Sequence, residues 1–191
     1  MSAATDDQLM LQVRDGEVGQ LGVLFERHHA PLFHFFVRLT SNRAVSEDLV
    51  QDVFFRMLKY RHTYRGDNRF TYWMYQIARN SRADHYRKRK REVQWNDDLP
   101  EPASDAPIAI EDLEHGQEVA LLGAALAELP EERRELLVLA RFQRLRYEEI
   151  AEILGCTEGA IKVRVHRAIK ELREAYFRVS KEKRHEMRSG E

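Results

Sequence analysis

The sequence has 191 residues, of which 43% are hydrophobic and 33% are charged, and a formal net charge of -1 at pH 7. This length suits two small domains, and the apolar content excludes global disorder. The single cysteine, Cys156, excludes an intramolecular disulfide and a cysteine-rich zinc site. No apolar run approaches the length of about 20 residues that spans a bilayer, and residues 1–7 lack a secretion-signal pattern. We therefore predict a cytoplasmic protein without direct membrane insertion.

Basic and acidic residues are segregated along the chain. Residues 61–91 contain ten Lys or Arg against two Asp or Glu, whereas residues 92–135 contain thirteen acids against two arginines. Residues 156–191 return to ten basic residues against six acidic ones. A single charge run usually marks only a solvated surface, but two basic blocks separated by an acidic block indicate polyanion binding at two places.

Apolar residues recur at spacings of three and four residues over most of the chain, which predicts an all-α protein. A short helix opens with a capping box, Thr5 with Gln8, and ends at Gly16. The next helical pattern covers residues 17–39, within which Pro31 should kink or split the helix.

A further helical pattern over residues 46–60 has an apolar stripe opposite a polar face. A turn signal follows at residues 64–68, where Gly66 tolerates the positive φ that most residues avoid. From Phe70 the apolar stripe resumes, and it fades into the basic run at residues 87–91. The sequence thus predicts one long helix that is apolar at its start and basic at its end.

Helical periodicity is lost between residues 92 and 110, where prolines stand among acidic residues, and this change predicts a linker. Trp95 is unusual there, because aromatic residues are scarce in linkers. It either docks on a partner or packs against its own domain, and the sequence leaves both interpretations open.

The second half of the chain returns to helical periodicity. It predicts a helix over residues 113–129, a new helix that starts at Pro130, a helix over residues 147–154 and one from Thr157 to about Val179.

Residues 147–168 have the pattern of a helix-turn-helix, in which Ala151 is small where two helices cross and Gly155 stands at the tight turn. The shared core is predicted to contain Ile150, Leu154, Ile161 and Val165. The residues left facing outward on the second helix suit a major groove flanked by phosphates. They are Lys162, Val163, Arg164, His166 and Arg167.

Two groups of segments carry a family resemblance. They are residues 47–54, 64–67 and 73–80 in the first half, and residues 129–136, 147–151, 159–162 and 166–168 in the second half. These groups resemble the second and the fourth conserved regions of the extracytoplasmic-function (group IV) RNA polymerase sigma factors of the sigma-70 family. Val163 and the Gly159–Ala160 pair depart from the serine and the Gly-Thr pair that are common in that family.

The resemblance implies an all-α fold of two small helical domains joined by a flexible acidic linker, with the helix-turn-helix in the C-terminal domain. The domain of residues 1–92 would bind the polymerase clamp and recognise and melt the minus-ten promoter element. The linker would cover residues 93–112, and the domain of residues 113–191 would recognise the minus-thirty-five element. The protein would direct promoter-specific transcription initiation in a stress or envelope response, without catalysis or a cofactor. Its implied partners are core RNA polymerase, promoter DNA and an anti-sigma factor.

The resemblance also implies roles for individual residues. Polymerase binding is expected of Asp48, Gln51, Asp52 and Phe55. Minus-ten DNA binding is expected of Tyr64, Arg65, Gly66, Asp67, Asn68, Asn80, Arg87 and Arg89. Minus-thirty-five DNA binding is expected of the outward residues of the helix-turn-helix, Lys162, Val163, Arg164, His166 and Arg167.

Two other functions stay open on the residues alone. A helix-turn-helix regulator that binds DNA as a dimer without polymerase needs a dimerisation helix and leaves residues 64–80 unexplained. A metal-dependent helical hydrolase would use His28 and His29 with nearby acids. Adjacent residues point to different sides of a helix, however, and no carboxylate or cysteine set completes such a metal site.

Overall fold

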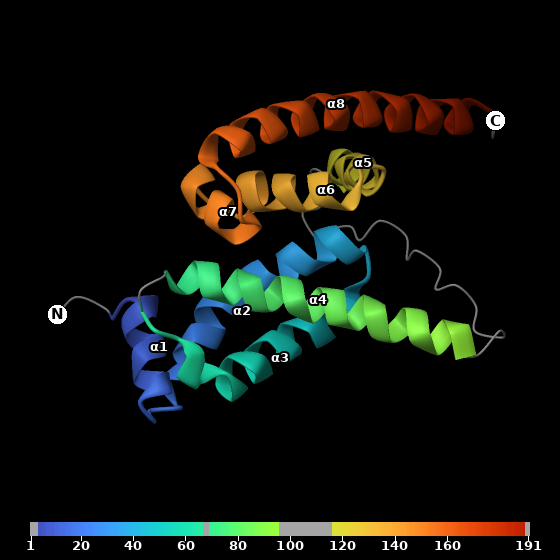
Figure 1. The fold of residues 1–191 in the computed structure, drawn as a ribbon. Helices are drawn as coiled ribbons and strands as arrows, with labels where there is room; N and C mark the ends of the chain where they lie inside the picture. The colour runs from blue at the N-terminus through green and yellow to red at the C-terminus, as the bar shows by residue number, and fades with distance from the viewer. Residues whose placement is uncertain (1–3, 67–68, 96–115, 190–191) are drawn as a thin grey trace. The chain divides into compact units, whose positions relative to one another are not determined.

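The computed structural model describes residues 4–66, 69–95 and 116–189, and the regular elements in these ranges are all helices (Figure 1). The described residues fall into two compact units. The first contains the described residues up to 95 except residues 37–43, which belong with residues 116–189 in the second. The prediction of an all-α protein with two helical domains is confirmed. The predicted linker lies largely outside the described residues, so its flexibility stays a prediction.

The helices in the described ranges do not include a candidate for a membrane-spanning segment, because none of them is both long enough and apolar enough.

The helical elements up to residue 95 are, in chain order, α1 (Asp6–Arg14), α2 (Gln20–Thr40), α3 (Arg43–Lys59), a 3-10 turn (Arg61–Thr63) and α4 (Phe70–Trp95). The predicted capping box opens α1. Thr5 Oγ1 accepts a hydrogen bond from the Gln8 N–H at 3.2 Å, and Gln8 Oε1 accepts one from the Thr5 N–H at 2.9 Å. Two orphan donors of the first turn are thereby satisfied reciprocally.

Pro31 lies inside α2, which continues past it as one helix, so the predicted split does not occur. Proline removes one helical hydrogen bond. The side chains of Leu32, Phe35 and Phe36 that follow it are fully buried. Their burial contributes about 1.5 to 3 kcal/mol each, which offsets the lost hydrogen bond and keeps the helix continuous.

Helix α4 extends to Trp95, so the start of the predicted linker, residues 92–95, is helical. The basic run from residue 87 loses the apolar periodicity on which the sequence prediction relied. Lysine and arginine are nevertheless good helix formers, and the helix continues through them without a core-facing stripe. The side chain of Trp95 is outside the described part of the structure, and both interpretations of its role stay open.

The core of the first unit combines aromatic, methionine and aliphatic side chains of α2, α3 and α4. Phe35 and Phe36 of α2, Met57 of α3 and Met74 of α4 are all buried. The ring of Tyr75 lies 5.2 Å from that of Phe35, and burial raises the pKa of its hydroxyl. The apolar stripes predicted for these helices therefore face the core.

The second unit contains α5 (Gly116–Ala127), α6 (Glu131–Leu137), a π-helical turn (Val138–Phe142), α7 (Tyr147–Leu154) and α8 (Glu158–Ser189). Figure 1 shows α8 as one long helix that curves past α7 and along α5 and α6. The predicted end of this helix near Val179 is wrong, because the charged residues beyond it are good helix formers. Pro130 is the cap before α6 instead of its first residue, and its carbonyl accepts hydrogen bonds from the N–H groups of Arg133 and Arg134.

The turn between α7 and α8 has the geometry that its glycine predicts. Gly155 adopts a left-handed conformation with φ 64°, and the N–H of Cys156 reaches back to the carbonyl of Ala151 at 3.0 Å. Thr157 caps α8, because its Oγ1 accepts a hydrogen bond from the Ala160 N–H at 3.2 Å. Of the predicted shared core, three residues are buried and one is half-buried: Ile150, Ile161 and Val165, and Leu154.

We expect Gly155→Ala to lower the free energy of unfolding by about 1 kcal/mol, because a Cβ is strained in the left-handed region. The matched control is Gly123→Ala inside α5, where an added Cβ would meet nothing within 4 Å. This substitution should raise stability by up to about 1 kcal/mol. Urea unfolding monitored by circular dichroism measures both changes, and effects of the same sign would contradict the special role of Gly155.

Candidate functional site

The first three turns of α8 have an apolar side and a basic side. Ile161, Val165 and Ala168 are buried in the second unit. All five predicted recognition residues are exposed on the remaining surface of the helix: Lys162, Val163, Arg164, His166 and Arg167. The exposed fraction of Val163 is 51%, which is high for a valine and leaves an apolar contact between cations. This surface offers charges for phosphates and an apolar group for a thymine methyl.

Lys162 is held by an ion pair on its own helix. Its Nζ lies 2.6 Å from Glu158 Oε1, one turn earlier, and this hydrogen bond raises the pKa of the ammonium group. The ammonium group has three N–H donors, so the pair with Glu158 leaves donors for other acceptors.

The predicted polymerase-binding residues lie along α3. Asp48 and Gln51 are exposed, and Phe55 has an exposed fraction of 64% although it is a large apolar residue. The opposite side of α3 is buried through Leu49 and Val53. An exposed aromatic ring beside polar groups is typical of the anchor of a protein interface.

Asp52, the fourth predicted polymerase-binding residue, belongs to a chain of ion pairs between α3 and α4. Arg56 Nε lies 2.7 Å from Asp52 Oδ2, and its Nη1 lies 2.7 Å from Asp84 Oδ2 of α4. Asp84 also pairs with Arg87. The hydrogen bond from Arg56 holds the pKa of Asp84 below its ordinary value, although burial acts in the opposite direction.

This chain of ion pairs borders a groove of about 220 Å³ between α3 and α4. Asp48 lines one side, and Ser81, His85 and Lys88 line the other. The Oγ atom of Ser81 is buried and has no hydrogen-bond partner among the described residues. The groove adjoins both the exposed side of α3 and the basic end of α4.

Tyr64, predicted to bind minus-ten DNA, lies instead in the core of the first unit. Its exposed fraction is 2%, and its ring centroid lies 5.2 Å from that of Trp73. Its hydroxyl donates a hydrogen bond to Asp7 Oδ1 at 2.7 Å. The structure therefore corrects the predicted DNA contact, because the side chain supports the neighbouring residues from within and offers no exposed surface.

The other predicted minus-ten residues have different positions. Arg65 and Gly66 are exposed, and Gly66 has φ 77° as its turn signal predicts. Asp67 and Asn68 lie outside the described residues. Along α4, Asn80 and Arg87 are exposed and Arg89 is half-buried.

The paired histidines have separate partners, which does not favour a shared metal ion. His28 Nε2 lies 2.7 Å from Asp6 Oδ2, whereas His29 Nδ1 lies 2.9 Å from the carbonyl of Phe25 and its ring stacks on that of Phe25. Within residues 4–66, 69–95 and 116–189, no group of three or more histidine, cysteine or acidic residues is arranged to hold a metal ion.

Comparison with known proteins identifies both halves of the chain. Residues 24–92 match the family Sigma-70 region 2, and residues 120–172 match Sigma-70, region 4. The RNA polymerase sigma factor CarQ of Myxococcus xanthus is 33% identical over 167 residues, which cover 86% of this chain and 94% of CarQ. The ECF RNA polymerase sigma factor SigM of Bacillus subtilis is 30% identical over 81% of this chain and 94% of its own. The chain belongs to the ECF sigma factors of the sigma-70 family.

This sigma factor also resembles solved structures. The sigma factor RpoE from Bartonella quintana, solved in complex with the anti-sigma factor NepR, is 29% identical with a TM-score of 0.63, over 81% of this chain and 94% of RpoE. CnrH, solved with the cytosolic domain of CnrY, shares the fold with a TM-score of 0.68 and 23% identity, over 88% of this chain and 95% of CnrH.

Family membership decides between the functions that the residues alone left open. Sigma factors are transcription initiation factors and not enzymes, which replaces the hydrolase hypothesis. The match to region 2 accounts for residues 64–80, which the hypothesis of a dimeric regulator left unexplained. Helix α1 precedes the residues that match region 2.

We expect the ion pair between Arg56 and Asp84 to stabilise the sigma factor near neutral pH by about 0.2 to 1 kcal/mol, the range of exposed pairs. Because the pKa of Asp84 is lowered in the folded state, this contribution is present above its ordinary value of 3.8 and is lost as pH falls through the folded pKa. Asp84→Asn should therefore destabilise the protein at pH 7 and have little effect once the pH is below the folded-state pKa of Asp84. Unfolding midpoints across this range test the expectation, and a pH-independent difference would contradict it.

Proposed function

We propose that this sigma factor belongs to group IV and brings core RNA polymerase to specific promoters through two separate surfaces. Residues 1–92 would hold the polymerase clamp and the minus-ten element, and residues 113–191 the minus-thirty-five element, with residues 93–112 as a linker. The observation that carries the proposal is the exposed basic side of α8, directly after the glycine turn of a helix-turn-helix. It coincides with a match to sigma-70 region 4.

At the minus-thirty-five element, Arg164 and Arg167 would contact phosphates, and Lys162 and His166 would contact base edges. Their exposure next to buried Ile161 supports this assignment, because a helix can enter the major groove only with its polar side outward. Guanidinium groups suit phosphate oxygens, and lysine suits the acceptors of guanine.

At the minus-ten element, strand opening needs a place for an unstacked base, because basic charge alone holds duplex and single strands alike. Extruding a base costs a few kcal/mol, which a pocket must offset. Gly66 allows close approach of the backbone, and Asn80 offers an exposed polar group on α4. We assign strand opening to the segment around these residues. Arg87 and Arg89 would hold the DNA backbone at the basic end of the helix.

We also propose control by an anti-sigma factor in a stress or envelope response. The support is the likeness to RpoE of Bartonella quintana, whose structure contains the anti-sigma factor NepR. The same α3 surface that would bind polymerase contains exposed Phe55, and a partner that covers it would compete with the enzyme.

Asp48→Ala combined with Gln51→Ala is expected to weaken binding to core RNA polymerase by about tenfold, because both side chains are exposed on the proposed docking side of α3. The fold should persist, since neither residue belongs to the core. A fluorescence binding titration with core enzyme measures the change, with Glu26→Ala, at an exposed position of α2, as the control. Unchanged affinity of the double variant would show that the docking surface lies elsewhere.

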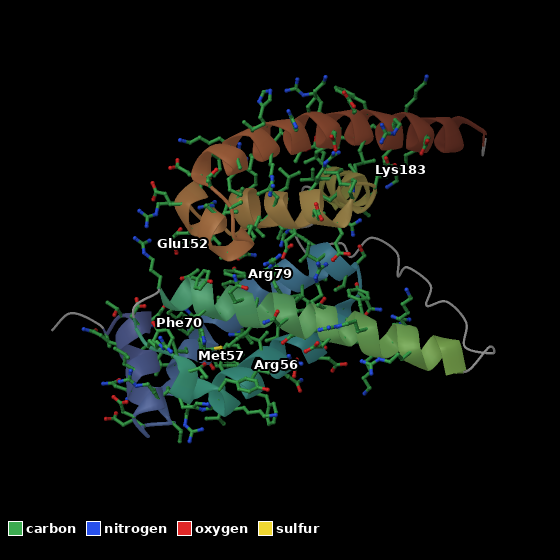
Figure 2. The ribbon with its side chains drawn as sticks, in the orientation of Figure 1. Arg56, Met57, Phe70, Arg79, Glu152 and Lys183 are labelled. Carbon is green, nitrogen blue, oxygen red and sulfur yellow. The ribbon has the colours of Figure 1, made fainter. Side chains whose placement is uncertain are left out.

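Arg167→Ala is expected to reduce the salt slope of promoter binding by about 0.9, the effect of losing one phosphate contact. Lys162→Ala should weaken binding to the preferred site by about 1 to 3 kcal/mol and change binding to other sequences little. Lys183→Ala, farther along α8, is the control for loss of charge alone (Figure 2). An unchanged sequence preference in Lys162→Ala and His166→Ala would remove both residues from the recognition set.

A further inference from the structure

Helix α1 precedes the residues that match region 2, yet it contacts both ends of the proposed minus-ten segment. Asp7 Oδ1 accepts a hydrogen bond from the Tyr64 hydroxyl at 2.7 Å and another from the backbone N–H of Phe70 at 2.8 Å. Phe70 is the first residue of α4, so Asp7 satisfies an orphan donor at the start of that helix from a different helix. One carboxylate oxygen thus joins Tyr64, two residues before Gly66, to Phe70, the residue that starts α4.

Two further contacts from α1 meet the same segment. Arg14 Nη1 donates a hydrogen bond to the carbonyl of Tyr64 at 3.4 Å. A Cβ built on Gly66 would lie 3.1 Å from Leu11 Cδ2, so the glycine backbone approaches α1 closely. Gly66 therefore has two reasons to be glycine, its positive φ of 77° and its contact with α1.

Burial of the two donors strengthens their hydrogen bonds to Asp7. Tyr64 is 2% exposed and Phe70 is 1% exposed, so water competes little for either donor. Removing the acceptor would leave a buried hydroxyl and a buried N–H without this partner, and such groups are costly to leave unbonded.

Asp6, the acidic residue next to Asp7, has different partners. Asp6 pairs with Arg27 and His28 of α2, at 2.7 Å in each case. Within the described residues it has no hydrogen bond or ion pair with Tyr64, Gly66 or Phe70. Asp6 therefore attaches α1 to α2, and it reaches α4 only through His28, whose ring lies 5.0 Å from that of Phe70. Asp7 instead hydrogen-bonds directly to Tyr64 and to the first residue of α4. The two adjacent acids provide a matched pair for experiment.

We propose that Asp7 is a positioning residue for minus-ten strand opening. By holding the Tyr64 hydroxyl and the Phe70 N–H on one oxygen, it fixes how the backbone at Tyr64 to Gly66 is oriented relative to the start of α4. The inference rests on the proposed function, because it assigns α1 a part in the same strand-opening step. Asp7 acts through Tyr64 and Phe70 and does not itself touch DNA.

The test uses the full chain bound to core RNA polymerase and a promoter with a fluorescent adenine analogue in the minus-ten element. Asp7→Ala is expected to reduce the equilibrium constant for strand opening by at least about tenfold, the loss for a hydrogen bond to a charged group. Polymerase affinity and binding to duplex promoter should stay within about twofold. Asp7→Asn keeps an acceptor oxygen and should restore opening, and the control Asp6→Ala should open the promoter like the parent.

Normal opening by Asp7→Ala would overturn the inference. Equal defects in Asp7→Ala and Asp6→Ala would also overturn it, because they would reflect general loosening of α1. A defect in Asp7→Asn as large as in Asp7→Ala would do the same, since the acceptor is retained.

If Asp7→Ala does not fold, Tyr64→Phe removes one of the two bonds and keeps the ring, and normal opening by that variant overturns the inference. If the unmodified protein opens no promoter, the proposed function is refuted. If the unmodified protein and all its variants open the promoter normally, only the inference about Asp7 is refuted.

Discussion

Each helix of the two units must bury one apolar side to form a core, and this requirement decides which charged residues face outward. On α8, buried Ile161 and Val165 recur at helical spacing, so the cations between them have no place in the interior. On α3, burial of Val53 leaves Asp48 and Gln51 on the exposed side. The candidate interfaces are thus consequences of core packing. Substitutions on them should change binding more than folding.

Polar contacts between helices fix their relative orientation more closely than core packing alone does. Arg56 bridges Asp52 and Asp84, so α3 and α4 are joined by charge as well as by apolar contact. Asp7 joins α1 to Tyr64 and to the first turn of α4. Such contacts are directional, and they fix the relative rotation of helices that apolar side chains would allow to slide. The elements proposed to bind polymerase and minus-ten DNA are therefore linked within the first unit.

Family membership shows what kind of protein this chain is, and the geometry shows which of its residues are exposed. The matches to sigma-70 regions 2 and 4 identify the chain as an initiation factor, and they cover most of α2 through α4 and most of α5 through the first half of α8. The geometry separates residues that face solvent from residues that support them. Tyr64 belongs to the supporting group, since its hydroxyl is bound within the unit and its ring is buried.

The sequence by itself determined the helices, the capping box at Thr5, the glycine turn at Gly155 and the outward basic residues of α8, because each depends on neighbours within a few positions. It missed the extension of α4 to Trp95, since helix propensity without an apolar stripe leaves no periodic signal. It also missed the role of Asp7, whose partners lie 57 and 63 positions away in the chain. Only tertiary structure brings such groups together, because their contact is set by the packing of whole helices and not by local sequence.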